Sequence, residues 1–209
     1  MRNPRVILAL VAIALLSACG AQTAMNAPPE VVSRAAYVHG GPTAITLYTM
    51  VNNRSGSGAH SSIMINASQR VIFDPAGSVR HKAMPERDDV LFGITPAIAD
   101  FYARAHARET YHVVIQRVEV PPEVAERALQ LAISNGAVSQ AQCALSITRI
   151  LSQLPGFEPI RSTWFPNKLS ESFAQLPGVT TERLYEYDDD DKEVALEAFD
   201  AEELVTQNQ

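Results

Sequence analysis

The sequence predicts an α+β domain in which a small antiparallel sheet packs against helices. Segments with the two-residue period of a strand crowd the first part of the chain, mixed elements follow, and segments with helical period come last. This order, without a regular alternation of strands and helices, is typical of an α+β fold. The chain has 209 residues, of which 46% are hydrophobic and 19% charged, and this suffices for one domain with a core.

The strand pattern occurs in five segments: 43–51, 60–65, 70–73, 111–120 and 183–187. In the first segment apolar and polar residues partly alternate, as expected for a strand. The second and third are joined by the short connection 66–69, which predicts a hairpin. Asp74, followed by proline, ends the third segment, and Pro121 stops the valine-rich fourth. The charged segment 78–93 lacks periodicity, so we expect a surface loop there.

Four helices are expected from apolar spacing and end signals. Thr95 precedes a proline and predicts the start of the first, and Gly136 is the expected stop of a second helix over 122–135. Ser139, with glutamine three residues later, fits a capping box and predicts the start of a third helix, which Pro155 closes. A shorter helix is expected over 167–176.

The N-terminal segment has the pattern of a secretory signal. Arg2 and Arg5 precede an apolar run over Val6–Leu16. This run is too short to span a bilayer, which takes roughly 20 residues. The sequence Leu16-Ser17-Ala18-Cys19 resembles the lipobox of bacterial lipoproteins. The resemblance implies that Cys19 becomes the acylated first residue of the mature protein. The other reading is an ordinary cleaved signal.

The resulting organisation has four parts: a signal peptide over 1–18, a lipidated cysteine and tether over 19–35, the α+β domain over 36–187, and an acidic tail over 188–209. We expect the tail to be disordered or a loose helix. The lipobox implies a cell-envelope location facing the periplasm, with the membrane as partner through the lipid on Cys19. Gly20 in place of aspartate resembles outer-membrane sorting.

Charge and composition exclude some functions. The formal net charge is −6, and no concentrated basic segment indicates nucleic-acid binding. No phosphate-binding glycine loop is present. Four residues could be assembled into a metal site, but none has tight ligand spacing, so neither a metal nor a cofactor is predicted. They are His39, His60, Asp74 and His81.

Cys143 is the first candidate for chemistry. With Cys19 committed to lipid, Cys143 is the one remaining cysteine and cannot form an intramolecular disulfide. Its place near a predicted helix start favours a thiolate, because unpaired N–H groups and the positive end of the helix dipole stabilise negative charge. The alternative is that Cys143 fills a gap in the core.

A cysteine nucleophile needs an imidazole to take its proton. His60 opens an apolar strand directly after a glycine-rich loop, where a ring can be both exposed and rigidly held. Asp74 ends the neighbouring strand of the predicted hairpin and could orient that ring. His106 and His112 lie among arginines or apolar residues, and solvation or packing explains both.

The order of these residues resembles a known family. A histidine at the head of a strand (His60), a polar residue on the next strand (Asp74) and a later cysteine at a helix start (Cys143) are similar to the circularly permuted papain-like thiol hydrolases. This NlpC-type branch includes lecithin:retinol acyltransferase-like proteins. The resemblance implies a permuted papain-like fold and a catalytic triad of these three residues.

Two functions follow from these observations. The first is a lipid-anchored cysteine hydrolase or acyltransferase that acts on peptide, amide or ester bonds. Its expected substrates are peptidoglycan peptides or lipid acyl groups. The second is a noncatalytic envelope lipoprotein that acts as a binding or structural module. The distance between the Cys143 thiol and the His60 ring separates the two.

Overall fold

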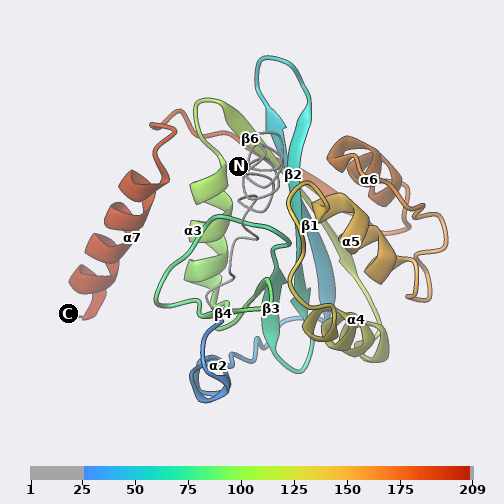
Figure 1. The fold of residues 1–209 in the computed structure, drawn as a ribbon, viewed down its shortest axis with the longest axis horizontal. Helices are drawn as coiled ribbons and strands as arrows, with labels where there is room; N and C mark the ends of the chain where they lie inside the picture. The colour runs from blue at the N-terminus through green and yellow to red at the C-terminus, as the bar shows by residue number, and fades with distance from the viewer. Residues whose placement is uncertain (1–25, 208–209) are drawn as a thin grey trace, which may run out of the picture.

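The computed structural model describes the backbone of residues 26–207 and the side chains of residues 26–200. Its centre is one antiparallel sheet with the strand order β4-β5-β3-β2-β1-β6-β7 (Figure 1). The predicted α+β class, with an antiparallel sheet against helices, is confirmed. The strands are β1 (Ala44–Asn52), β2 (Gly58–Asn66), β3 (Arg70–Phe73), β4 (Glu86–Arg87), β5 (Val90–Leu91), β6 (Tyr111–Glu119) and β7 (Thr180–Leu184).

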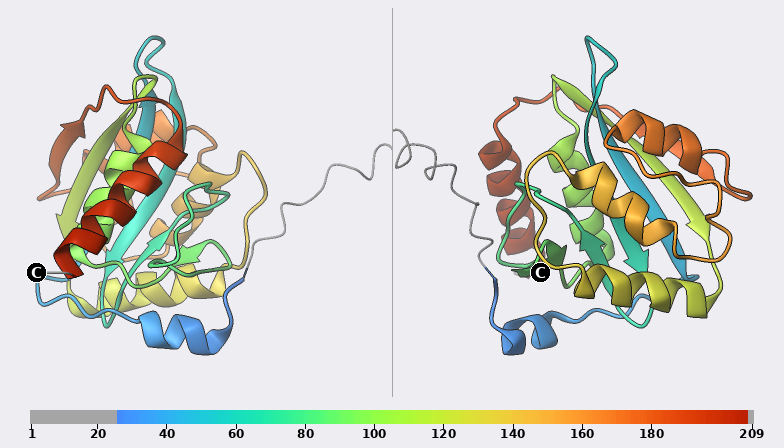
Figure 2. Two further views of the ribbon diagram at one scale, coloured as in Figure 1. Left: turned by 90° about the vertical axis from the view of Figure 1, so that its left-hand side faces the viewer. Right: turned by 45° about the vertical axis from the view of Figure 1, so that its right-hand side comes forward.

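Helices cover both faces of this sheet. They are α2 (Pro29–Ala35), α3 (Pro96–His106), α4 (Pro122–Ser134), α5 (Cys143–Leu151), α6 (Pro166–Phe173) and α7 (Lys192–Gln207). Helices α4, α5 and α6 lie on one face, while α3 lies on the other with α7 beside it (Figures 1 and 2). Among residues 26–207, no helix has the length and apolar character needed to cross a bilayer.

The alternation of side chains along β1 and β2 builds two separate cores. Ile45 and Ile63 point to the face covered by α4, α5 and α6, where they join a large apolar cluster. Tyr48 and Met50 point to the opposite face and join a second cluster with α3. Both faces of the sheet are therefore largely buried at β1 and β2, which explains why these two strands contain no aspartate, glutamate, lysine or arginine.

The segment expected as a surface loop, 78–93, instead extends the sheet. Strands β4 and β5 pair with each other, and Val90 pairs with Phe73 of β3. Asp88 and Asp89 join β4 to β5 with φ angles of 52° and 63°, which a two-residue hairpin turn with two left-handed residues requires. Strands of two residues are too short to show a period, so the sequence pattern missed them.

The N-terminal end of the described chain differs from expectation, and the C-terminal end adopts one of the two states expected of it. Part of the segment expected as a tether, 19–35, forms α2, and the Ala27 N–H donates to the Glu86 carbonyl at 2.7 Å. The acidic tail expected to be disordered or loosely helical contains α7, which runs along α3 (Figure 2). Phe199 stacks on Phe101 at 4.4 Å between ring centroids, and this apolar contact holds the tail. The predicted signal and Cys19 lie outside the described residues.

The last strand begins earlier than expected. The sequence predicts a strand over 183–187, whereas β7 covers Thr180–Leu184 and pairs with β6. Most of β7 is exposed, so its position depends on backbone pairing at the sheet edge, which side-chain alternation does not reveal.

Candidate functional site

The hairpin of β2 and β3 sets the positions of His60 and Asp74. Ile63 pairs with Phe73, the last residue of β3, so the next position places Asp74 opposite Ser62. His60 lies two residues before Ser62 and therefore on the same face of the sheet, one diagonal step from Asp74. His60 Nε2 lies 2.6 Å from Asp74 Oδ1.

Asp74 is held in a tight turn after β3. Its N–H donates to the Asp89 carbonyl at 2.8 Å, and its own carbonyl accepts from the Gly77 N–H at 2.9 Å. A Cβ atom at residue 77 would lie 1.8 Å from Asp74 Oδ2, so only glycine fits there. The turn therefore leaves room for the carboxylate beside the strand end, where it meets the His60 ring.

Cys143 is the first residue of α5, and the predicted capping box is wrong. Gln142 occupies the N-cap position, and no side chain caps the helix. Ser139 lies instead in a turn, where its carbonyl accepts from the Gln142 N–H. Ala141 has a φ angle of 63°, which turns the chain sharply before the helix and excludes an earlier start. Cys143 therefore lies at the end of α5 where the helical N–H groups are unpaired.

The Cys143 thiol reaches His60 from the other side of the sheet. Helix α5 packs on the apolar face of β2. Strand β3 ends at Phe73, opposite Ile63, so the residues of β2 that precede Ile63 have no β3 partner on that edge. The thiol hydrogen-bonds the His60 ring there and accepts from the backbone N–H groups of Ser61 and Ala144. Because His60 Nε2 is occupied by Asp74, Nδ1 is the nitrogen left for the sulfur. The structure thus brings together all three residues singled out from the sequence.

These contacts favour a thiolate and an imidazolium. Burial alone would raise the pKa of the Cys143 thiol, yet that pKa is lowered because the His60 ring and two backbone N–H groups stabilise negative charge on sulfur. Burial opposes charge on His60, but the hydrogen bond and charge of Asp74, with a further contribution from Cys143, raise the pKa of the ring to about 10. Burial would also raise the pKa of Asp74, and its bond to His60 lowers it.

Helix α3 supplies two further residues that the sequence analysis did not assign to the site. The Tyr102 hydroxyl lies 2.7 Å from Ser62 Oγ and also hydrogen-bonds the Asp74 carboxylate. Because a carboxylate only accepts, the phenol donates to Asp74. Burial, followed by the charge of Asp74, raises the pKa of Tyr102, so the phenol stays protonated. An aromatic residue in a helix with apolar spacing gives no sequence signal for such polar contacts, so the sequence analysis did not single out Tyr102.

His106, one turn further along α3, packs beside the His60 ring with 6.3 Å between ring centroids. Its Nδ1 lies 2.8 Å from the Tyr102 carbonyl, which accepts the Nδ1 proton. Burial lowers the pKa of His106 to about 4, so this ring is neutral at physiological pH. His106 therefore fills the wall beside His60 without adding charge, a packing role that the sequence analysis allowed for it.

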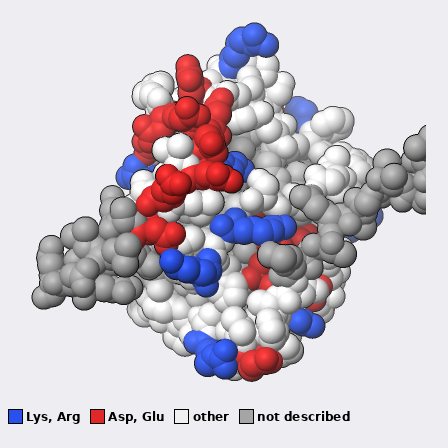
Figure 3. Space-filling view, turned by 60° about the vertical axis from the view of Figure 1, so that its left-hand side comes forward, with Lys and Arg blue, Asp and Glu red and all other residues white. Residues whose placement is uncertain are grey.

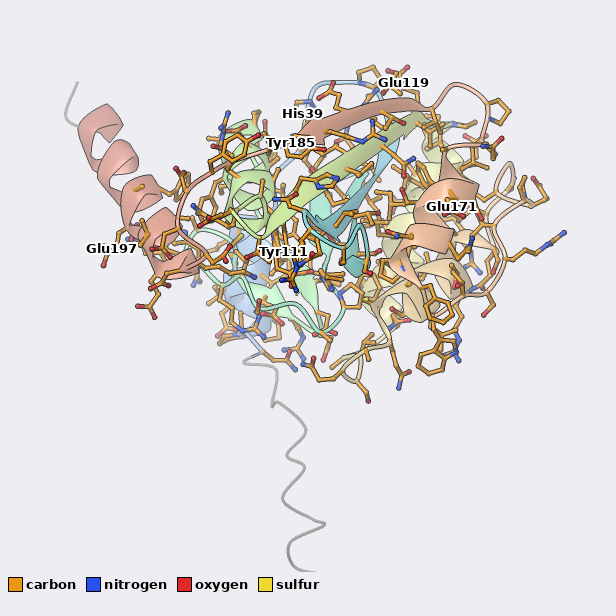
Figure 4. The ribbon with its side chains drawn as sticks, turned by 90° about the horizontal axis from the view of Figure 1, so that it is seen from above. His39, Tyr111, Glu119, Glu171, Tyr185 and Glu197 are labelled. Atoms are coloured by element: carbon orange, nitrogen blue, oxygen red, sulfur yellow. The ribbon has the colours of Figure 1, made fainter. Side chains whose placement is uncertain are left out.

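A cavity of about 480 Å³ opens beside His60. It lies between the start of β2, the turn at 108–111 and the segment that precedes α7. Figure 4 marks both ends of β6, with Tyr111 at the end that borders the cavity and Glu119 at the opposite end. The cavity is lined by Met50, Ala59, His60, Ala76, Gly77, Ser78, His106, Arg108, Thr110, Tyr111, Asp190 and Lys192. His60 is 20% exposed, whereas Cys143 behind it is 6% exposed.

The four residues considered for a metal site are not assembled. His60 and Asp74 pair with each other, while His81 Nε2 lies 3.0 Å from Asp200 Oδ1. His39 lies near Tyr37, with 6.2 Å between ring centroids. Within the described part of the chain, no three histidine, cysteine or acidic residues gather in a way that could hold a metal ion.

Comparison with known protein families, curated proteins and solved structures finds no match to this chain. The site is therefore interpreted from its own geometry.

Proposed function

We propose that this protein is a cysteine hydrolase or acyltransferase that acts on peptide, amide or ester bonds. The single observation that carries the proposal is the chain of hydrogen bonds from the Cys143 thiol through His60 to Asp74. A nucleophile, a base in contact with it and a third group that orients the base are the parts that covalent acyl transfer needs. The order of His60, Asp74 and Cys143 along the chain supports a permuted papain-like arrangement, which is part of the proposal.

Each residue then has a defined step. The Cys143 thiolate attacks the substrate carbonyl carbon, and backbone N–H groups at the start of α5 stabilise the developing oxyanion. The His60 imidazolium donates its proton to the leaving nitrogen or oxygen, which leaves a thioester on Cys143. His60 next takes a proton from water, or from an acceptor alcohol or amine, which attacks the thioester; the C–S bond breaks, the acid, ester or amide product leaves, and the Cys143 thiolate and His60 imidazolium are restored. Asp74 keeps the ring oriented throughout.

The location of the reaction is part of the proposal. A signal ending at Cys19 supports a lipid-anchored protein of the bacterial cell envelope that faces the periplasm, with the outer membrane favoured by Gly20. Acyl chains on Cys19 would hold the domain at the membrane surface. Peptidoglycan peptides and lipid acyl groups are the carbonyl compounds within reach of such an anchor.

Alkylation by iodoacetamide tests the proposal. The full chain with Cys19→Ser keeps Cys143 as its one thiol, because the sequence contains two cysteines. We expect Cys143 to react at its plateau rate well below pH ~8.5, the ordinary pKa of a thiol. His60→Gln should move this reactivity to higher pH, since the positive partner of the thiolate is lost.

His112→Gln is the matched control, because His112 bonds Asn53 at 2.7 Å and is not part of the triad. It should leave the alkylation profile unchanged. A Cys143 that stays inert, or that titrates like a free thiol in the parent chain, contradicts the proposed chemistry and favours the noncatalytic alternative.

A further inference from the structure

Residues 188–191, which precede α7 and which we call the acidic segment, contact residues that line the cavity beside the proposed acyl-transfer site. Asp190 accepts from Thr110 twice, from the backbone N–H at 3.0 Å and from the hydroxyl. Arg108 Nη1 lies 3.6 Å from Asp188 Oδ2. Two carboxylates of the tail thus meet hydrogen-bond donors of one short turn between α3 and β6.

The same turn borders the cavity that contains His60. Arg108 and Thr110 both line it, and Asp190 lies in it with them. The Arg108 side chain is only 6% exposed, and its Nε has no hydrogen-bond partner among the described residues. A buried guanidinium that is incompletely paired is costly unless an anion contacts it. These donors therefore form a site suited to a carboxylate.

Directly after the acidic segment, the chain also contacts a second part of the cavity lining. Asp190 contacts Thr110, and Lys192 Nζ donates to Ser78 Oγ at 2.8 Å, with all four residues lining the cavity. Ser78 follows the turn that holds Asp74, so this part of the chain is bound to the lining at two places, one of them next to that turn. Figure 3 shows the acidic side chains gathered on this side of the molecule, with basic side chains next to them.

We propose that Arg108 and Thr110 form a carboxylate-binding subsite of the acyl-transfer centre, and that Asp188 and Asp190 occupy it in place of substrate. This inference rests on the proposed function and adds a substrate class to it. The substrate carries a carboxylate near the carbonyl that Cys143 attacks. It must displace the acidic segment to bind, so the tail lowers the activity toward such substrates.

The test compares thiol-reactive probes that differ only in charge. The probes are maleimides with a carboxylate at the end of alkyl chains of increasing length, and the primary amide of each. The full chain with Cys19→Ser is labelled with both, and the ratio of the acid rate constant to the amide rate constant is measured. Because both rate constants depend equally on the intrinsic reactivity of Cys143, a change in that reactivity leaves their ratio unchanged.

Asp188→Asn with Asp190→Asn should raise the acid-to-amide ratio by about tenfold at the best chain length, the scale of one charge-assisted hydrogen bond. The matched control is Asp189→Asn with Glu197→Gln, which removes the same charge from positions whose side chains are not paired with Arg108 or Thr110. It should leave the ratio near that of the parent. Adding Thr110→Ala to the first variant should lower the ratio again.

The outcomes are distinct. An unchanged ratio in the Asp188 and Asp190 variant, or an equal rise in the control, overturns the subsite while rapid labelling by the amide leaves the proposed function standing. Slow labelling by both probes in every variant contradicts the proposed function and overturns the subsite with it. Circular dichroism of each variant establishes that a change in ratio comes from folded protein.

Discussion

The two faces of the sheet bury different kinds of residues. The face under α4, α5 and α6 buries an apolar cluster that includes Ile63, Ile147 and Phe173. The opposite face, under α3, buries Asp74 and His106 next to aromatic and apolar residues. Burying apolar area stabilises the fold, whereas burying ionisable groups is costly unless they are hydrogen-bonded. Both faces thus bury apolar area that stabilises the fold, and the face under α3 also holds the groups available for chemistry; we call it the polar face and the other the apolar face.

Cys143 connects the two faces. It belongs to α5, which packs on the apolar face, yet its thiol contacts His60 of the other face beyond the end of β3. The apolar core fixes the helix and thereby the position of the sulfur. This division predicts that substitutions of the ionisable and hydroxyl groups on the polar face change the reactivity of Cys143, and that substitutions in the cluster under α5 change stability without changing that reactivity.

The largest effect is expected on the polar face, from His60→Gln. The proposed reaction should slow by roughly 10²–10⁴-fold, the usual contribution of a general base. The measurement is kcat/KM once a substrate is found, and until then the rate constant for alkylation of Cys143 at neutral pH, which falls to the extent that the pKa of the thiol rises. A variant that keeps the parent rate at neutral pH would show that His60 does not act on the thiol.

Ile147→Ala tests the apolar face. Ile147 is fully buried in α5, so its truncation should reduce the free energy of unfolding by about 2–5 kcal/mol. Urea denaturation measures this loss. The pH profile of Cys143 alkylation in the folded variant should match the parent, and a shifted profile would mean that the two faces are not separable.

Asp74→Asn removes the negative partner of His60 and keeps the shape of the side chain. Asp74 raises the pKa of His60, and the charged ring in turn lowers the pKa of Cys143, so the substitution should raise the pKa of the thiol. The acid limb of the alkylation profile should move to higher pH by about one to two units, the scale of a hydrogen bond to a charged group. No movement would argue against the proposed role of Asp74.

Tyr102→Phe is expected to have the smallest effect. It removes the hydroxyl that contacts Ser62 and Asp74 and should reduce stability by about 1–3 kcal/mol, because buried polar groups lose a partner. The acid limb should move in the same direction as in Asp74→Asn, but less. Tyr48→Phe is a control, because among the described residues the Tyr48 hydroxyl hydrogen-bonds the weakly accepting sulfur of Met64, at 3.7 Å, in the same cluster.

Local patterns made part of the site predictable. The strand period and the short connection at 66–69 predicted the hairpin, and the hairpin was the reason for expecting Asp74 near His60. The proline after Thr95 predicted a helix start there, and the Thr95 side chain accepts from the Ile98 N–H, as an N-cap residue does. These features depend on residues close in sequence, so the sequence alone contains their signal.

The remaining features depend on contacts between distant segments. The bond from Tyr102 to Asp74 joins α3 to the end of β3, and an apolar stripe on a helix does not indicate it. Ser139 fitted the capping pattern, but the sharp turn at Ala141 moved the helix start to Cys143. The tail was predicted from its charge alone, which left disorder and a loose helix open. Its helix α7 contacts α3 through the stacking of Phe199 on Phe101, a contact between distant segments that charge does not indicate.

Ultraviolet absorbance shows directly whether Cys143 is ionised next to His60. The ultraviolet absorbance of the thiolate can be followed with pH in the full chain with Cys19→Ser, with Cys19→Ser and Cys143→Ser together as the blank. We expect a thiolate signal that persists below the ordinary thiol pKa of about 8.5 and disappears only at lower pH. A signal that develops only at or above that pKa would contradict a Cys143 thiolate paired with His60.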